Sequence, residues 1–208
     1  MKLSIGAVAL VAVVVTPLVG AAQEAEISGN VGFVSDYFYR GIQQKTSSGS
    51  AGLDLAVDAF SIGTWAADVG DGNEVDLYAA LGTEVDGFSI SVGGTGYFYT
   101  GDFDSTYLEG NLNAGYGAVS AEFSYGQYRP DAGNQTYWFL GITVEEEGLY
   151  ATFGTFGKDF GGEYFEAGYG VSVGELDLSA AWIYSTEALI GADDHTLTFG
   201  ISHTFDIN

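Results

Sequence analysis

Apolar and polar side chains alternate with a period of two along almost the whole chain from residue 27 onward. In residues 74–85, Val75, Leu77 and Leu81 fall on one side of an extended chain, and Asp76 and Glu84 fall on the other. Successive side chains of a β-strand point to opposite faces, whereas a helix repeats every ~3.6 residues. The alternation therefore predicts strands with one apolar face each, and an all-β fold.

Turn-forming residues divide the alternating pattern into twelve predicted strands. These cover residues 27–42, 51–60, 62–69, 74–85, 88–99, 107–116, 119–128, 136–145, 149–157, 164–173, 176–185 and 195–205. Tight links at 60–61, 86–87, 117–118, 147–148 and 174–175 alternate with longer polar links at 43–50, 70–73, 100–106, 129–135, 158–163 and 186–194. Short turns at one end and longer loops at the other are typical of an antiparallel up-and-down transmembrane β-barrel, and strands of ~9–11 residues cross a bilayer when tilted.

The first residues resemble a secretory leader. Lys2 is followed by the apolar run 5–15 and by Gly20-Ala21-Ala22, a small-residue cleavage site. An n-region, an apolar stretch too short for a membrane span and such a site predict a cleaved signal peptide over 1–22. The barrel domain is then 23–208, exported to the outer membrane of a Gram-negative bacterium, with periplasmic termini and the longer loops outside.

Composition excludes several classes of protein. The chain has no cysteine, so an exported fold must hold together without disulfides. The formal net charge of −23 argues against nucleic acid as a partner, because phosphates attract Lys and Arg. With 32 glycines and 2 prolines, the composition suits strands and tight turns.

A soluble β-sandwich is the alternative fold, with the acidic face outside. The barrel is favoured because closure leaves no unpaired strand edge in lipid. Amphipathic aromatic rings favour the level of the lipid headgroups, and several stand at the strand ends beside the longer links. The predicted aromatic girdle comprises Tyr37, Trp65, Trp138, Trp182 and Tyr184.

The last strand, 195–205, resembles the terminal strand by which outer-membrane barrels are recognised for insertion. Thr198, Gly200 and Phe205 stand in the expected places, although His203 and the residues after Phe205 depart from the pattern. The expected partners are the barrel-assembly machinery during insertion, and outer-membrane lipid and lipopolysaccharide afterwards. The oligomeric state is left open.

The stretch 30–44, NVGFVSDYFYRGIQQ, carries Arg40 at the end of the first predicted strand, in a chain with only 5 basic residues. The alternation places a set of acids on the lumen face with it: Asp36, Asp54, Asp58, Asp76, Glu84, Glu109, Glu122, Glu166 and Asp177. Arg40 is expected to pair with Asp36, Asp54 or Asp58. Rings of carboxylates produce cation-preferring pores, whereas a fully paired interior would plug the barrel.

The sequence contains no clear motif for a metal site or for an enzyme active site. The loop acids, such as Asp102 and Asp104, lack the alternate spacing of a calcium loop, so no metal or other cofactor is expected. An Asp–His pair at Asp194-His195 stands at a rim, but no nucleophile motif such as Gly-x-Ser-x-Gly accompanies it. No catalytic residue is assigned, and the chain is not expected to be an enzyme.

The segment 30–44, with its Ser35-Asp36-Tyr37 and Arg40-Gly41 block, resembles the hallmark of the TorF-type family of proteobacterial porins. Gly63-Thr64-Trp65 and residues 74–78 are similar to the segments that follow in that family. The resemblance implies an outer-membrane barrel and carries over no substrate, cofactor or catalytic residue. Together with the inward acids, it leads us to expect passive diffusion of small hydrophilic solutes with a preference for cations; the alternative is a non-conducting barrel with a structural or surface-interaction role.

Overall fold

The computed structural model describes residues 25–207, so the predicted signal peptide, 1–22, lies outside the described residues. The chain forms twelve strands and one short helix. The first six strands are β1 (Glu26–Tyr39), β2 (Ile42–Val57), β3 (Phe60–Gly70), β4 (Gly72–Val85), β5 (Phe88–Thr100) and β6 (Thr106–Tyr116). The remaining elements are β7 (Val119–Arg129), β8 (Gln135–Glu146), β9 (Leu149–Lys158), β10 (Glu163–Val173), β11 (Leu176–Ser185), α1 (Glu187–Ile190) and β12 (Asp194–Asp206).

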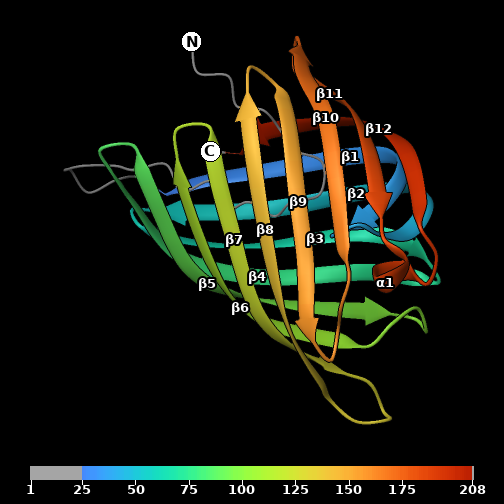
Figure 1. Cartoon of the computed structure of the whole chain (residues 1–208). Coiled ribbons are helices and arrows are strands. Elements are labelled where there is room, and N and C mark those ends of the chain that lie inside the picture. The colour runs from blue at the N-terminus through green and yellow to red at the C-terminus, as the bar shows by residue number, and fades with distance from the viewer. Residues whose placement is uncertain (1–24, 208) are drawn as a thin grey trace.

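Every strand pairs antiparallel with its neighbours in sequence, and β1 pairs with β12 to close the barrel (Figure 1). The closing seam runs from Ser28↔Asp206 to Val34↔Gly200. The predicted twelve-stranded up-and-down barrel is therefore confirmed. Closure removes both free sheet edges, because it pairs the backbone of the first strand with that of the last. No helix among residues 25–207 is long and apolar enough to cross a membrane.

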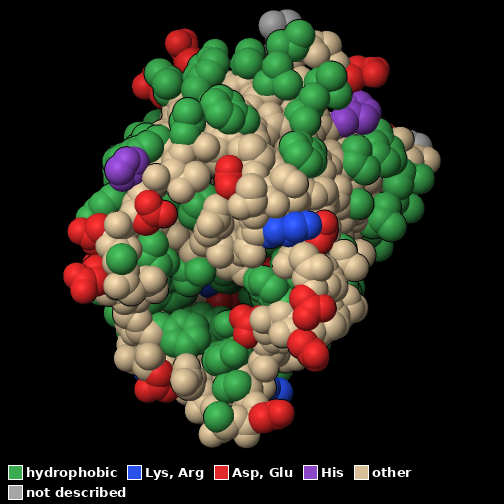
Figure 2. All heavy atoms as spheres, turned by 90° about the vertical axis from the view of Figure 1, so that its right-hand side faces the viewer, with side chains coloured by type: hydrophobic (Ala, Val, Ile, Leu, Met, Phe, Trp, Pro, Cys, Tyr) green, Lys and Arg blue, Asp and Glu red, His purple; other side chains and the backbone are tan. Residues whose placement is uncertain are grey.

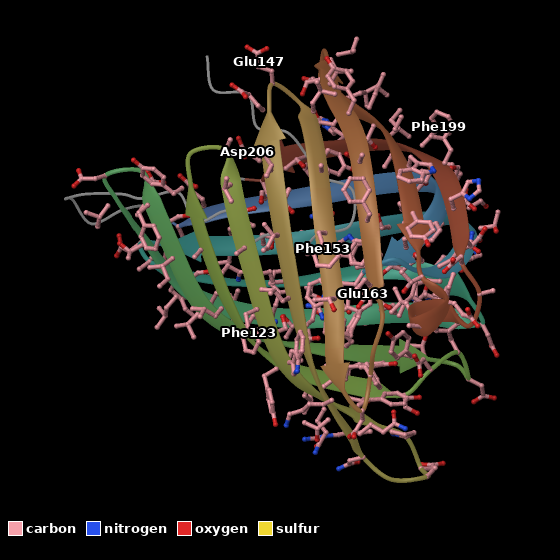
Figure 3. The ribbon with its side chains drawn as sticks, in the orientation of Figure 1. Phe123, Glu147, Phe153, Glu163, Phe199 and Asp206 are labelled. Carbon is pink, nitrogen blue, oxygen red and sulfur yellow. The ribbon has the colours of Figure 1, made fainter. Side chains whose placement is uncertain are left out.

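The two faces of the wall differ as the alternation predicts. On β4, Leu77 and Leu81 expose 53% and 56% of their surface, whereas Glu74 and Asp76 expose only 1% and 2%. Figure 3 labels three phenylalanines of the apolar outer face, Phe123, Phe153 and Phe199. Such a surface belongs in lipid, since monomeric soluble proteins rarely expose contiguous apolar areas of this extent.

The turns after the even-numbered strands have two residues each. Asp86-Gly87 and Glu147-Gly148 both have positive φ at both positions, the geometry that matches the right-handed twist of a hairpin. Four of the five predicted tight links are confirmed. The fifth lies at residues 58–59 rather than 60–61, so Asp58, predicted as a lumen residue, is instead an exposed turn residue with φ 51°. Its short polar side chain tolerates this left-handed conformation.

At the opposite end, the last four connections are longer, as predicted, but the first two are tight. β1 and β2 are joined by Arg40-Gly41 alone, and β3 and β4 by Asp71 alone. The predicted first strand therefore ends three residues too late, and the predicted loop 43–50 is strand. The Gln, Ser and Thr residues of this segment predict a solvated loop, whereas most of it pairs with β1 in a hairpin.

This hairpin leaves the barrel wall. β1 pairs with β12 only as far as Val34, and β2 pairs with β3 only from Ser50 onward. Between these limits β1 and β2 pair only with each other, with an irregularity at Tyr37/Phe38. We call residues 35–49 the inner hairpin. Gly41 lies at the tip of the inner hairpin, and its carbonyl accepts a 2.5 Å hydrogen bond from the buried Ser185 of β11. This contact places the tip inside the barrel.

Candidate functional site

Arg40 stands at the tip of the inner hairpin and is buried in the lumen. Arg40 and Gly41 have φ values of 46° and 79°, so both adopt left-handed backbone. This two-residue turn suits a twisted hairpin. The residue exposes only 7% of its surface although it carries a full charge. A buried guanidinium requires compensating partners, and the opposite wall supplies them.

The guanidinium of Arg40 donates hydrogen bonds to two carboxylates and one hydroxyl. Its Nη1 and Nη2 donate to the two oxygens of Glu109 on β6, at 2.6 and 3.0 Å. Nη2 also lies 2.5 Å from Glu122 Oε1 and 3.0 Å from Ser124 Oγ, both on β7. The two-point contact with Glu109 matches the planar fork of arginine. The expected pairing of Arg40 with Asp36, Asp54 or Asp58 is wrong, because the hairpin carries the side chain across the lumen.

Aromatic rings complete the surroundings of the guanidinium. Its Cζ lies 4.2 Å from the ring centroid of Phe139 on β8 and 4.9 Å from that of Tyr39. Cations are attracted to such ring faces. Two wall hydroxyls, from Tyr97 and Tyr137, donate to Glu109 at 3.2 and 2.7 Å. We call the wall residues Glu109, Glu122, Ser124 and Phe139 the Arg40 cradle.

Strand register explains why these residues meet. Residues of even number on β7 and of odd number on β6 and β8 point inward, and Asn111 pairs with Ser124 across β6 and β7. Gly126 provides room, because a methyl group there would lie 2.7 Å from Tyr137 Cζ and 2.9 Å from Glu109 Cγ. Sequence analysis assigned Glu109 and Glu122 to the lumen but missed Ser124 and Phe139, which the same alternation marks as inward.

A second acidic cluster lies on β4. Tyr37 of the inner hairpin donates a 2.5 Å hydrogen bond to Glu74, and the Tyr37 ring lies 5.7 Å from that of Trp65. Asp76 has one buried oxygen, Oδ1, without a hydrogen-bond partner. Tyr37, 3% exposed, and Trp65, on the face of the buried residue Ala67, are therefore wrong as girdle residues. Tyr37 turns inward because its hairpin has left the wall, and the predicted set of lumen acids lacked Glu74.

The other predicted lumen acids are distributed along the barrel and do not join the cradle. Tyr78 donates to Asp54 at 2.6 Å, Tyr150 to Glu166 at 2.5 Å and Ser172 to Asp177 at 2.5 Å. Asp36 accepts hydrogen bonds from Ser35 and Gln43 within the inner hairpin. Glu84 borders a cavity of about 840 Å³ at the short-turn end, together with Ser89, Ser120 and Glu145.

The remaining girdle candidates lie on the outer face. Trp182 is 40% exposed and stacks on Tyr184 with the ring centroids 6.3 Å apart. Trp138 shares the face of Leu140 and Ile142 on β8, opposite to that of the buried Tyr137. These positions are compatible with contact between the rings and lipid.

Stacked rings narrow the lumen at the end of the longer loops. Tyr107 stacks on Tyr128 at 4.4 Å, and Tyr137 stacks on Phe160 of the loop 159–162 at 4.7 Å. Both Tyr107 and Tyr128 donate to Asp104, at 2.9 and 2.8 Å. Figure 2 faces the side that carries α1 and shows a hollow among the loops, bordered by acidic side chains. The two ends of the barrel therefore differ: aromatic rings pack together at the end of the longer loops, and the cavity bordered by Glu84 lies at the end of the short turns.

Metal binding finds no support in the geometry. Within residues 25–207, no three His, Asp or Glu side chains gather at a distance suited to a metal ion. Asp104 accepts hydrogen bonds from the hydroxyls of Tyr107 and Tyr128, and Asp68 forms an ion pair with Lys45. Asp104 and Asp68 therefore have protein partners.

The sequence matches a family model described as a bacterial protein of unknown function (Gcw_chp) over residues 19–202. No curated protein matches the chain. These comparisons do not identify the TorF-type family.

Among solved structures, one from work on the in-meso crystallization of membrane proteins has a TM-score of 0.61 at 8% identity, over 88% of this chain and 84% of that chain. Pseudomonas aeruginosa OpdK with vanillate has a TM-score of 0.43 at 14% identity, over 78% of this chain and 58% of that chain. A BenF-like porin from Pseudomonas fluorescens Pf-5 has a TM-score of 0.42 at 11% identity, over 84% and 59%. The chain thus spans less than two thirds of these two proteins, and the likeness to solved structures concerns the fold alone.

Proposed function

We propose that this chain, which belongs to the Gcw_chp family of bacterial proteins of unknown function, is a porin-like channel of the outer membrane. It would pass small hydrophilic solutes and prefer cations. The proposal includes the TorF-type relationship suggested by the block at Arg40-Gly41, cleavage of the leader and insertion by the barrel-assembly machinery. It assigns no enzymatic activity.

The observation that carries the proposal is the imbalance of charge in the lumen. Glu74, Asp76 and Glu109 are all buried on the inner face, whereas Arg40 is the only buried basic residue in the described part of the chain. Carboxylates inside a low-dielectric wall attract cations and repel anions. A solute crossing this lumen would meet acids at the short-turn end as well, where Glu84 and Glu145 border the cavity.

The inner hairpin sets the width of such a path. It occupies the lumen without forming part of the wall, so its position can change without breaking the closed hydrogen-bonded circuit of strands. Arg40 pairs with both Glu109 and Glu122 and offsets one of their two negative charges while it is bound. Withdrawal of the hairpin would widen the lumen and expose both carboxylates together.

A non-conducting barrel is the second candidate. It is favoured by the packing at the loop end, where Tyr137, Phe139 and Phe156 are buried against Phe160 and Tyr164. If these rings and the inner hairpin stay in place, solutes do not pass and the loops serve surface contacts.

Single-channel recording of the purified, refolded protein in a planar bilayer under a salt gradient tests the proposal. We expect discrete current steps and a reversal potential displaced toward that of the cation. Arg40→Ala should increase both conductance and cation selectivity, because it removes the only buried positive charge among residues 25–207. Silent bilayers for both proteins, with insertion verified by heat-modifiable gel mobility, would favour the non-conducting barrel.

A further inference from the structure

The cradle and its occupant belong to different parts of the molecule. Glu109, Glu122, Ser124 and Phe139 stand on β6, β7 and β8 of the wall, whereas Arg40 enters from the inner hairpin. The occupant is separated from the carboxylates by 69 and 82 residues in sequence. The wall thus presents a complete binding site, and a side chain of the same chain fills it.

The chemistry of the cradle selects a guanidinium group. One carboxylate meets the fork at both Nη atoms, while a second carboxylate and a hydroxyl accept from Nη2. The Phe139 ring lies 4.2 Å from Cζ, at the distance of a cation–π contact. A planar cation with donors at its edge and an apolar face fits this set better than a hydrated metal ion does.

Wall contacts hold the cradle in place independently of Arg40. Tyr97, Tyr137 and Asn111 donate to Glu109, the last at 3.1 Å. Asn111 also donates to Ser124 at 3.0 Å, and Ser124 donates to Glu122 at 2.9 Å. None of these supporting groups lies on the inner hairpin. Withdrawal of Arg40 would therefore leave a preorganised acidic site in the lumen.

The inner hairpin makes other polar contacts with the wall, among them the 2.5 Å hydrogen bond that Tyr37 donates to Glu74. Ser185 donates to the carbonyl of Gly41, Thr198 donates to that of Asp36, and Lys45 pairs with the half-exposed Asp68. A two-stranded hairpin is marginally stable by itself. The guanidinium of Arg40 contacts two carboxylates, whereas Lys45 and Tyr37 contact one each, and hydrogen bonds that involve charged groups are stronger than neutral ones.

We propose that the Arg40 cradle is a binding site for small solutes that carry a guanidinium group, and that Arg40 is its internal occupant. A solute of this class competes with Arg40 for Glu109 and Glu122. Its binding releases the tip of the inner hairpin and widens the lumen. The inference rests on the proposed channel function, because the solute must enter the lumen to reach the cradle. To that function it adds the chemical class of the solute and the inner hairpin as the segment that moves when the solute binds.

Calorimetric titration of the refolded protein in detergent with methylguanidinium tests the site without any need for current. Arg40→Ala should bind one methylguanidinium saturably, about tenfold more tightly than the wild type, where Arg40 competes. The double variant Arg40→Ala/Glu109→Gln should bind at least about tenfold more weakly than Arg40→Ala, because it loses a charged acceptor. Tetramethylammonium, which has no N–H donor, and sodium at equal ionic strength are the matched control ligands. Equal binding of all three cations by Arg40→Ala, or of none, would overturn the proposal.

Hydrogen exchange of the wild-type protein provides the second measurement, should Arg40→Ala fail to fold. Methylguanidinium should accelerate amide exchange of residues 35–49 severalfold relative to equal sodium, and should leave the wall strands unchanged. An unchanged rate in the inner hairpin would contradict competition with Arg40. Because neither assay depends on conductance, binding by a protein that carries no current would separate failure of the channel proposal from failure of this one.

Discussion

The same two strands, β1 and β2, build both the barrel wall and the inner hairpin, and the two halves differ in sequence as in position. In the wall half, Val31, Phe33 and Leu53 are 47%, 49% and 52% exposed on the lipid side. The segment 43–49 of the hairpin half reads QQKTSSG and contains no large apolar side chain. Lipid on one face therefore imposes the alternation, and a segment that enters the lumen is released from it.

The first prediction breaks the anchor of the inner hairpin. Glu109→Gln removes the two-point partner of Arg40 and leaves a buried guanidinium with less compensating charge. We expect a loss of ~3–5 kcal/mol in the free energy of unfolding, as for one partner of a buried pair. Urea unfolding in liposomes, followed by gel mobility, measures it. Glu84→Gln at the cavity is the control, with an expected change within ~0.5 kcal/mol; equal losses in both variants would refute a special role for the cradle.

The second prediction compares wall and hairpin directly. Leu112→Arg places a charge near the centre of β6 on the lipid face, where Leu112 is 45% exposed. It should cost ~2–4 kcal/mol if this position lies near the bilayer midplane. Thr46→Arg, at an exposed position of the inner hairpin, should change stability by less than ~0.5 kcal/mol. The same unfolding assay applies, and a tolerated Leu112→Arg would argue against lipid on this face.

The third prediction isolates packing at the hairpin tip. A methyl group at Gly41 would meet Tyr164 Cβ at 2.4 Å, whereas at Gly117 nothing lies within 4 Å, and both glycines have positive φ. Each alanine variant should suffer backbone strain of ~1–2 kcal/mol. Gly41→Ala should lose a further ~1–3 kcal/mol through overpacking. Thermal unfolding of both variants gives the difference, and identical values would mean that the tip does not pack on Tyr164.

The smallest expected effect concerns Lys45. Its ion pair with Asp68 joins the inner hairpin to the wall, but the two side chains remain 25% and 47% exposed. Solvent screens such a pair, so Lys45→Ala should cost ~0–1 kcal/mol. Hydrogen exchange of residues 35–49 is the more sensitive measurement. A destabilisation as large as that of Glu109→Gln would place the main anchor of the hairpin here instead of at Arg40.

Much of the architecture follows from local patterns. The alternation at Val75, Leu77 and Leu81 marks the lipid face, and turn pairs such as Asp86-Gly87 mark one end of the barrel. Twelve strands and the inward placement of Glu109 and Glu122 could be predicted in this way. The inner hairpin could not, because polar residues such as Gln43 and Ser48 have the composition of an external loop.

The sequence by itself determined the alternation, the strand count and the acidic inner face, since these depend on neighbours one or two residues apart. Only the tertiary structure decided that Arg40 faces Glu109 and Glu122, and that Tyr37 turns inward. Those contacts depend on where pairing of β1 with β12 ends at Val34, after which the hairpin is free to enter the lumen. Burial of a single guanidinium then favours the position in which the most carboxylate oxygens can reach it.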